Sequence, residues 1–221
     1  NLYTTRRMVA GLKTAPWLLV QNGTLAAKNG EIIWEHGLKD REAEKLVRTL
    51  EALEVPVVVY RNLSRGGGHE YRGFGGFSRG APFRAVEEFN DFSAITGVST
   101  RIPNDRVGEI KSTLQVCLSK KSRLISSRGR SRTWLEITPV AARKDRALNR
   151  LCSELDVDPQ QVIYFGDNQN DLEALNLVGF PRVVADGLPE LRKLFPLVAA
   201  SSHQGPAREL VRLFGLEKPP G

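Results

Sequence analysis

The stretch that decides the fold is Val162-Ile163-Tyr164-Phe165-Gly166-Asp167-Asn168-Gln169-Asn170-Asp171. Its first four residues are β-branched or aromatic, which predicts a buried strand, and a glycine follows at once. In an open α/β sheet, ligands bind in the crevice beyond the carboxyl ends of the strands. The sequence therefore predicts a binding site at this glycine and at the polar residues that follow it.

Two carboxylates follow the glycine. Gly166 allows a tight turn, after which Asp167 and Asp171 can face one pocket from the strand end and from the first turn of the next helix. Together with Asn170 they suit Mg2+, which takes a few carboxylates plus water and a substrate phosphate. The alternative is structural, with Asp171 as a helix N-terminal acid and Asp167 as a turn residue. The pattern alone does not separate these two interpretations.

The elements upstream of this stretch have a regular order. A strand that ends at its proline is predicted at Leu135-Glu136-Ile137-Thr138-Pro139, and an amphipathic helix is predicted to begin at Lys144. The apolar positions of this helix include Ala147, Leu148, Leu151, Cys152 and Leu155. A turn at residues 156–159 then leads into the strand before Gly166.

This order resembles the haloacid-dehalogenase-like phosphatase superfamily, in particular its Cof-type group, whose members carry a large inserted cap. The resemblance rests on the strand at residues 135–139, on Lys144 and on the stretch from Phe165 to Asp171. It continues near the N-terminus, where a strand at residues 17–21 is followed by a hairpin with an Asn29-Gly30 turn.

The resemblance implies an α/β fold. Residues 1–38 and 134–221 would form a Rossmann-like core, which is a parallel sheet flanked by helices, and residues 39–133 would form an inserted α+β cap domain. It also implies a Mg2+-dependent phosphatase that hydrolyses a small phosphomonoester, expected to be a sugar phosphate, through an aspartyl-phosphate.

Roles for single residues follow from the same resemblance. Lys144 would stabilise charge on the phosphate and the nucleophile, and Asp167 and Asp171 would bind Mg2+. Asn22 and Asn170 would be substrate-binding residues.

The nucleophile and the acid/base of the superfamily cannot be assigned in this sequence. Both are aspartates of an N-terminal Asp-x-Asp-Gly-Thr strand, and no aspartate precedes Asn22. We expect a preceding segment to supply them. The alternative is a non-catalytic member that binds a phosphorylated ligand or a partner protein.

The middle of the chain is predicted to contain a helix at residues 39–53 and a strand at residues 55–60. Residues 61–84 interleave glycine, arginine and aromatic residues, and no packed element is predicted there. We interpret this segment as a cap loop, with His69 facing solvent, and the alternative is a module that binds single-stranded nucleic acid.

Regular elements are predicted again after this segment. A helix is predicted at residues 86–92 and a half-buried strand at residues 113–119. The basic turns at residues 120–123 and 126–132 are interpreted as solvated surface.

Composition bounds the class of protein. The chain has 221 residues, of which 41% are hydrophobic and 26% charged, as in ordinary soluble globular proteins. No apolar run approaches membrane-spanning length and no signal peptide is present, so we expect a cytoplasmic protein without a membrane partner. The formal net charge of +7 favours anionic partners, and we expect a small phosphorylated substrate rather than nucleic acid. The sequence does not indicate an oligomeric state.

Overall fold

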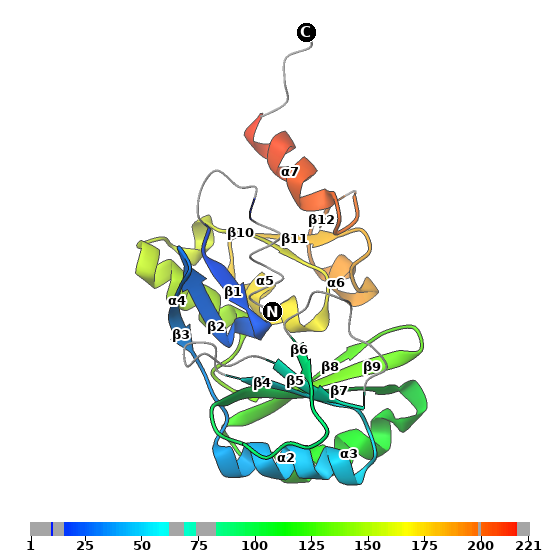
Figure 1. The fold of residues 1–221 in the computed structure, drawn as a ribbon. Coiled ribbons are helices and arrows are strands. Elements are labelled where there is room, and N and C mark those ends of the chain that lie inside the picture. The colour runs from blue at the N-terminus through cyan, green and yellow to red at the C-terminus, as the bar shows by residue number, and fades with distance from the viewer. Residues whose placement is uncertain (1–9, 11–15, 62–68, 74–82, 199, 216–221) are drawn as a thin grey trace. The chain divides into compact units, whose positions relative to one another are not determined.

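The computed structural model describes residue 10 and residues 16–61, 69–73, 83–198 and 200–215. The chain divides into two compact units, Asn1–Arg143 and Lys144–Gly221, and each is described by itself (Figure 1). Most of the glycine- and arginine-rich segment predicted as a cap loop lies outside the described residues.

The first unit begins with a small antiparallel sheet. Its strands are β1 (Leu18–Val20), β2 (Leu25–Lys28) and β3 (Glu31–Glu35), in that order, and a 3-10 turn η1 (Gln21–Gly23) joins β1 to β2. Asn29 and Gly30 connect β2 to β3 with φ angles of 50° and 89°, which are the positive values that a two-residue hairpin turn needs. The predicted hairpin is confirmed.

A six-stranded sheet forms most of the first unit. The spatial order is β6-β5-β4-β7-β9-β8, and all neighbours are antiparallel except β5 and β6. The strands are β4 (Val57–Arg61), β5 (His69–Arg72), β6 (Phe83–Ala85), β7 (Ile95–Pro103), β8 (Ser122–Arg128) and β9 (Arg132–Pro139). The helices α2 (Asp40–Ala52) and α3 (Val107–Cys117) lie on the same side of this sheet (Figure 1).

The core of the first unit lies between this sheet and the two helices. Helix α2 turns a stripe of apolar residues towards the sheet, where they pack with side chains of β4, β7 and β9. The fully buried members of the stripe are Ala43, Leu46, Val47 and Leu50. The acids Asp40 and Glu42 lie in its first turn, where the helix dipole favours negative charge.

Two element predictions for the middle of the chain were wrong. Residues 113–117 belong to α3, whose buried residues Ile110 and Leu114 are four apart, and Val116 of the expected strand is 79% exposed. Residues 86–92 form no helix, because this segment instead buries Phe89 against the core in irregular backbone.

His69 was predicted to face solvent within an unstructured loop. It begins β5, which pairs with β4, and it is buried with its ring 5.0 Å from that of Tyr60. The sequence did not show this strand because it has only four residues and glycines flank it.

The strand at residues 135–139, expected in the core domain, is part of β9 and pairs with β7 and β8. The predicted boundary between residues 133 and 134 therefore falls within a strand, whereas the compact units divide after Arg143. The division of the chain into a core domain and an inserted cap stays a prediction.

The second unit contains a parallel sheet of three strands in the order β10-β11-β12. These are β10 (Ile163–Gly166), β11 (Phe180–Val184) and β12 (Leu197–Val198). The helices are α4 (Lys144–Leu155), α5 (Leu172–Leu177), α6 (Pro189–Leu194) and α7 (Gly205–Phe214), with short 3-10 turns η4 (Pro159–Gln161) and η5 (Gln169–Asp171). The predicted α/β class, with a parallel sheet and flanking helices, is confirmed.

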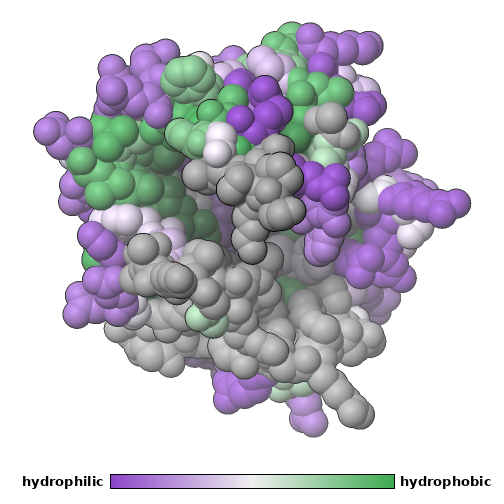
Figure 2. Space-filling model, turned by 90° about the horizontal axis from the view of Figure 1, so that it is seen from above, coloured by the Kyte–Doolittle hydropathy of each residue, from purple (hydrophilic) through white to green (hydrophobic). Residues whose placement is uncertain are grey.

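The surface mixes polar and apolar side chains. In the face shown in Figure 2, hydrophilic side chains form a large part of the coloured surface, and apolar side chains gather in smaller areas. Within the described residues, none of the helices has both the length and the apolar character needed to cross a membrane.

Candidate active site

The candidate site begins where β10 ends. A Cβ atom on Gly166 would lie only 2.8 Å from the Cβ of Asp171 and 3.1 Å from Cδ1 of Leu175. Glycine is therefore required at this position so that the side chain of Asp171 can lie against the end of the strand.

The carboxylate of Asp171 is the centre of the site. Its Oδ1 accepts hydrogen bonds from Lys144 Nζ at 2.6 Å and from Tyr164 Oη at 2.7 Å. Its Oδ2 accepts from the backbone amides of Asp167 at 3.1 Å and Asn168 at 3.0 Å. The side chain is only 3% exposed, and four donors compensate for the water that burial removes.

The same carboxylate also shapes the turn after the strand. Asn168 caps η5 by accepting a hydrogen bond from the backbone amide of Gln169 at 2.7 Å, and Asp171 completes a capping box by accepting from the amide of Asn168. Local helix chemistry thus fixes Asp171 in the position where Lys144 and Tyr164 reach it.

The surroundings shift the pKa values of the two aspartates in opposite directions. Burial acts to raise the pKa of Asp171, but the charge of Lys144 and the hydrogen bonds from Lys144 and Tyr164 outweigh it and lower the pKa. Burial and the nearby charge of Asp171 raise the pKa of Asp167, and Lys144 opposes this shift only in part. Asp171 is therefore the permanent anion, and Asp167 is the carboxylate that gains most from an added cation.

Tyr164 is the site residue that the sequence analysis missed. Burial, and then the charge of Asp171, raise the pKa of its phenol, so it keeps its proton and donates to Asp171. An aromatic residue in a strand is usually a packing residue, which is how this one was interpreted. The available signal was its spacing, because Tyr164 lies two residues before Gly166 and hence on the same face of β10.

The structure brings together four of the five predicted site residues. Lys144 begins α4, Asp167 follows β10, and Asn170 and Asp171 lie in η5, all in the second unit. Asn22 lies in the first unit, in η1, where its Nδ2 donates to Glu136 Oε2 at 3.0 Å. The catalytic, substrate-binding and metal-binding roles of these five residues stay predictions.

A family comparison decides what kind of protein this site belongs to. The model of the family described as haloacid dehalogenase-like hydrolase matches residues 1–207, which is most of the chain. The chain belongs to this family.

Curated relatives match a shorter part of this haloacid dehalogenase-like chain. A phosphoglycolate phosphatase of Methanothermobacter thermautotrophicus is 31% identical over 80 residues, which are 36% of this chain and 36% of that protein. An HMP-PP phosphatase of Serratia proteamaculans is 35% identical over 69 residues, which are 31% of this chain and 25% of that protein. The matches thus span about a third or less of the length of these relatives.

Solved structures share the fold at low sequence identity. A haloacid dehalogenase-like hydrolase from B. subtilis has a TM-score of 0.80 at 13% identity and covers 95% of this chain and 83% of its own. One from Bacteroides thetaiotaomicron has a TM-score of 0.77 at 17% identity, with 96% and 81% covered. A subclass IIB sugar phosphatase has a TM-score of 0.70 at 11% identity, with 98% and 81% covered. The predicted haloacid-dehalogenase-like fold is confirmed.

The family resemblance implies Mg2+, and Asp167 and Asp171 suit the role of a Mg2+ ligand to different degrees. Asp167 lies at the carboxyl end of β10, and its pKa is raised first by partial desolvation and then by the negative charge of Asp171, which a cation would offset. A cation on Asp171 would instead have to displace one of its four hydrogen-bond donors. Among the described residues, no three His, Cys, Asp or Glu side chains converge on one point. Of the two aspartates, Asp167 is therefore the one whose carboxylate can take a cation without losing these hydrogen bonds.

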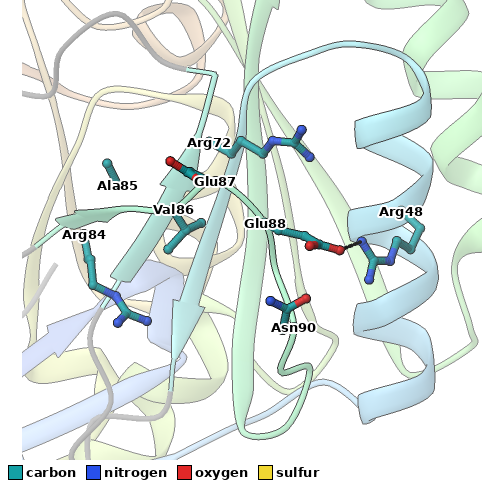
Figure 3. Close-up of a pocket in the computed structure, with 8 residues that line it drawn as sticks. All are labelled: Arg48, Arg72, Arg84, Ala85, Val86, Glu87, Glu88 and Asn90. Atoms are coloured by element: carbon teal, nitrogen blue, oxygen red, sulfur yellow. Dashed lines mark ion pairs between the residues drawn. The ribbon is translucent and has the colours of Figure 1, made fainter.

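A separate hollow of about 710 Å3 lies in the first unit (Figure 3). Its lining includes Arg48, Arg72 and Arg84, but each is already paired with a carboxylate. Arg48 and Arg72 lie 2.9 and 2.8 Å from Glu51, and Arg84 pairs with Glu70. The positive charge of these arginines is thus balanced by the carboxylates beside them. The residues around Asp171 therefore remain the candidate active site.

Proposed function

We propose that this protein acts in the Mg2+-dependent hydrolysis of a small phosphomonoester, with a sugar phosphate as the expected substrate class. The observation that carries the proposal is the ammonium of Lys144 held against buried Asp171, beside exposed Asp167, at the carboxyl end of a parallel strand. The phosphatases and the sugar phosphatase to which the chain is similar support the reaction class.

Lys144 supplies positive charge for the phosphoryl group. Its ammonium has three N–H donors, and the one directed at Asp171 leaves two that can bind phosphoryl oxygens. Because Asp171 carries a negative charge, its carboxylate holds the ammonium of Lys144 in one place. Asp171 thus acts as a positioning residue in this proposal.

Asp167 is the proposed Mg2+ ligand. When bound, Mg2+ neutralises phosphate charge and helps to orient the group that is displaced. The backbone around Asp167 is fixed from two sides, because its amide donates to Asp171 and its carbonyl accepts from the amide of Leu188 at 2.8 Å. Asn22 and Asn170 remain the proposed substrate contacts.

The family resemblance implies a two-step reaction at an aspartate. A carboxylate oxygen attacks phosphorus, the ester oxygen leaves with a proton as an alcohol, and water then cleaves the acyl phosphate to release phosphate and restore the carboxylate. Asp40, the first aspartate of the chain, lies at the start of α2, and we assign the nucleophile to no residue of this chain.

The test is phosphate release by the full-length product of the encoding gene. It is incubated with Mg2+ and a panel of sugar phosphates and other phosphomonoesters, beside the variants K144A and D167N. We expect each substitution to lower kcat/KM by roughly 100-fold or more, since each removes charge stabilisation at the reacting group. The matched controls are K193A and D156N, which change an exposed lysine and an exposed aspartate of the same unit.

Mg2+ binding gives an independent readout. Calorimetric titration of Mg2+ into this chain should give weaker binding for D167N than for D156N. Unchanged Mg2+ binding in D167N would remove the metal assignment, and a full-length product that cleaves no phosphomonoester would remove the catalytic one.

A further inference from the structure

Strand β8 forms one edge of the six-stranded sheet, and in the described part of the chain its backbone is paired only with β9. It runs over seven residues, whereas β6 at the opposite edge has three. An edge strand presents N–H and C=O groups with which another extended chain can pair, and a very short edge offers few of them. The edge at β8 is therefore the one that can accept an added strand.

The strand register shows which backbone groups of β8 point away from β9. Hydrogen bonds lie at both ends of the pair, from the amide of Val140 to the carbonyl of Lys121 at 2.8 Å and from the amide of Gly129 to the carbonyl of Arg132 at 2.9 Å. Hydrogen-bonded and non-hydrogen-bonded residues alternate along an antiparallel pair. The odd-numbered residues of β8 thus bond to β9, and the even-numbered ones direct their backbone groups outwards. Those in the body of the strand are Leu124, Ser126 and Arg128.

The first residue of the strand agrees with this pattern. The amide of Ser122 donates to the carbonyl of Ser119 at 3.3 Å and not to β9. Among the described residues, no partner outside the sheet reaches the backbone groups of Leu124, Ser126 or Arg128. These three amides and three carbonyls are called the free edge. An extended chain of about five residues could pair with all of them.

The hairpin that carries the free edge is basic. Residues 119–140 contain six lysines and arginines and one acidic residue, Glu136, which lies on β9 and accepts a hydrogen bond from Asn22 at 3.0 Å. A second acid, Glu42 of α2, accepts from the hydroxyls of Ser119 and Ser122 at the start of β8. These two carboxylates offset part of the charge and leave an excess of positive charge along β8.

Two arginines of β8 lie on opposite faces of the sheet. Side chains alternate along a strand, and Arg123 and Arg128 are five residues apart. Neither forms an ion pair with another described residue. A ligand on one face could meet only one of them, but the side chains of an added strand alternate in the same way. Acidic residues five apart in such a strand can therefore lie opposite both arginines.

Other occupants fit the free edge less well. Antiparallel pairing of two β8 strands would bring Lys120 and Lys121 of one copy towards Arg130 and Arg132 of the other, and like charges on paired strands are destabilising. Nucleic acid lacks the alternating N–H and C=O groups that pair with a strand edge. An acidic extended peptide supplies both the backbone groups and the opposite charge.

We propose that β8 binds an extended acidic segment of a partner protein, which pairs with the free edge and places acidic residues opposite Arg123 and Arg128. Lys144 and Asp167 take no part in this interaction, so it is separate from the proposed hydrolysis.

The first test is the fluorescence anisotropy of a labelled peptide, Glu-Thr-Val-Thr-Val-Glu, titrated with the protein. We expect saturable binding at about 50 mM salt that weakens at about 200 mM, because salt screens exposed ion pairs. A peptide of the same composition with adjacent glutamates should bind at least about threefold more weakly, because it can meet only one of the two arginines. Equal binding of the two peptides would overturn the proposed register.

Charge variants test the location. R123Q/R128Q should weaken binding of the first peptide by at least about threefold. The matched control is K193Q/R208Q, which removes the same charge from exposed positions of the second unit and should bind like the unmodified protein. Equal losses in the two double variants would mean attraction by net charge alone and would overturn the assignment to β8.

A proline at position 126 tests the backbone pairing. S126P removes an amide that points away from β9, so the bonds between β8 and β9 stay complete while the free edge loses a donor. It should weaken peptide binding by at least about tenfold. A peptide with N-methyl groups on its four central amides tests the same pairing without changing the protein, and it should bind weakly too. Tight binding of the methylated peptide would overturn strand addition.

Amide hydrogen exchange then locates the contact. Saturation with the first peptide should slow exchange at the outward amides of Leu124, Ser126 and Arg128, and leave residues 123, 125 and 127 nearly unchanged because these already bond to β9. Unchanged exchange at the outward amides, or no binding of the acidic peptide, would overturn the proposal. The arginines would then serve only to keep the edges of separate molecules apart.

Discussion

At the scale of single residues, the geometry of the site depends on how closely the side chain of Asp171 approaches Gly166 at the end of β10. Asp171 accepts four hydrogen bonds only because Gly166 leaves room beside the end of β10. The identity of one small residue therefore controls the geometry of a charged one, and both can be tested by conservative substitutions.

Replacing Gly166 by alanine should destabilise the protein. The new Cβ would lie 2.8 Å from the Cβ of Asp171, so the side chain or the strand must move, at a cost of about 1–3 kcal/mol. Urea unfolding measures this cost. The matched control is G108A in α3, where no atom lies within 4 Å of the new Cβ and alanine should stabilise the helix by about 0.5–1 kcal/mol. Equal effects of the two substitutions would contradict the packing argument.

Replacing Tyr164 by phenylalanine removes one donor from Asp171 Oδ1 and leaves the ring in place. We expect a loss of about 1.5–3 kcal/mol in the free energy of unfolding near pH 7, because the bond is made to a charged acceptor. The bond favours the ionised form of Asp171, whose folded pKa is lowered, so its contribution is present at neutral pH and is lost as the pH falls through that pKa. A gap between the two proteins that does not shrink in acid would contradict this assignment.

At the scale of elements, hydrophobic periodicity and turn residues correctly predicted the helices and strands that local sequence determines. The helix α4, the strand β10 and the hairpin at Asn29-Gly30 have clear apolar patterns or turn residues and were predicted close to their bounds. The C-terminal half of helix α3 was predicted as a strand because Leu114, Val116 and Leu118 alternate as in a strand, although Val116 is exposed in the helix. Strand β5 was missed because it gains its stability from pairing with β4, which sequence periodicity cannot show.

The candidate site, too, was only partly predictable from the sequence. Lys144, Asp167, Asn170 and Asp171 were predicted from order and spacing, and the structure brings them together in one unit. The four donors to Asp171 could not be predicted, because two are backbone amides whose direction depends on the turn after β10.

Helix α7 is joined to β11 by a carboxylate whose titration can be followed. Glu209 accepts from Arg212 at 2.8 Å and from Arg182 of β11 at 3.2 Å, and these hydrogen bonds, that of Arg212 first, lower its pKa to about 2. A lowered folded pKa means that the contribution to stability is present above pH ~4.5 and is lost as the pH falls towards about 2. The stability difference between the unmodified protein and E209Q should therefore shrink across this window.

Thermal or urea unfolding between pH 5 and pH ~2 measures this difference. The matched control is E190Q, which changes an exposed glutamate in the first turn of α6. A difference for E209Q that stays constant across the window would contradict the role of the pair with Arg182 and Arg212.

At the scale of the whole molecule, the two units have separate cores. Leu46 is fully buried in the cluster between α2 and the six-stranded sheet, and Leu175 is buried in a cluster with β11 and α6. No residue belongs to both of these clusters. A cavity in one core should therefore act mainly within its own unit.

The variants L46A and L175A test this separation. Each should lower stability by about 2–5 kcal/mol within its unit, because a buried leucine leaves a cavity. Hydrogen exchange should become faster in α2, β4 and β7 for L46A, and in β10, β11 and α6 for L175A. Faster exchange of β10 amides in L46A would show that the two cores are coupled.

The hydrogen bond between Lys144 and Asp171 also bears on conformational entropy. A free lysine side chain has about 2 kcal/mol of rotamer entropy, and a ligand that had to order it would bind more weakly by up to that amount. Here the ammonium is held 2.6 Å from Asp171 by the fold itself, so its rotamer is restricted before any phosphate arrives. Substitutions that loosen Asp171, such as G166A or Y164F, should therefore weaken phosphate affinity although every charged side chain is retained.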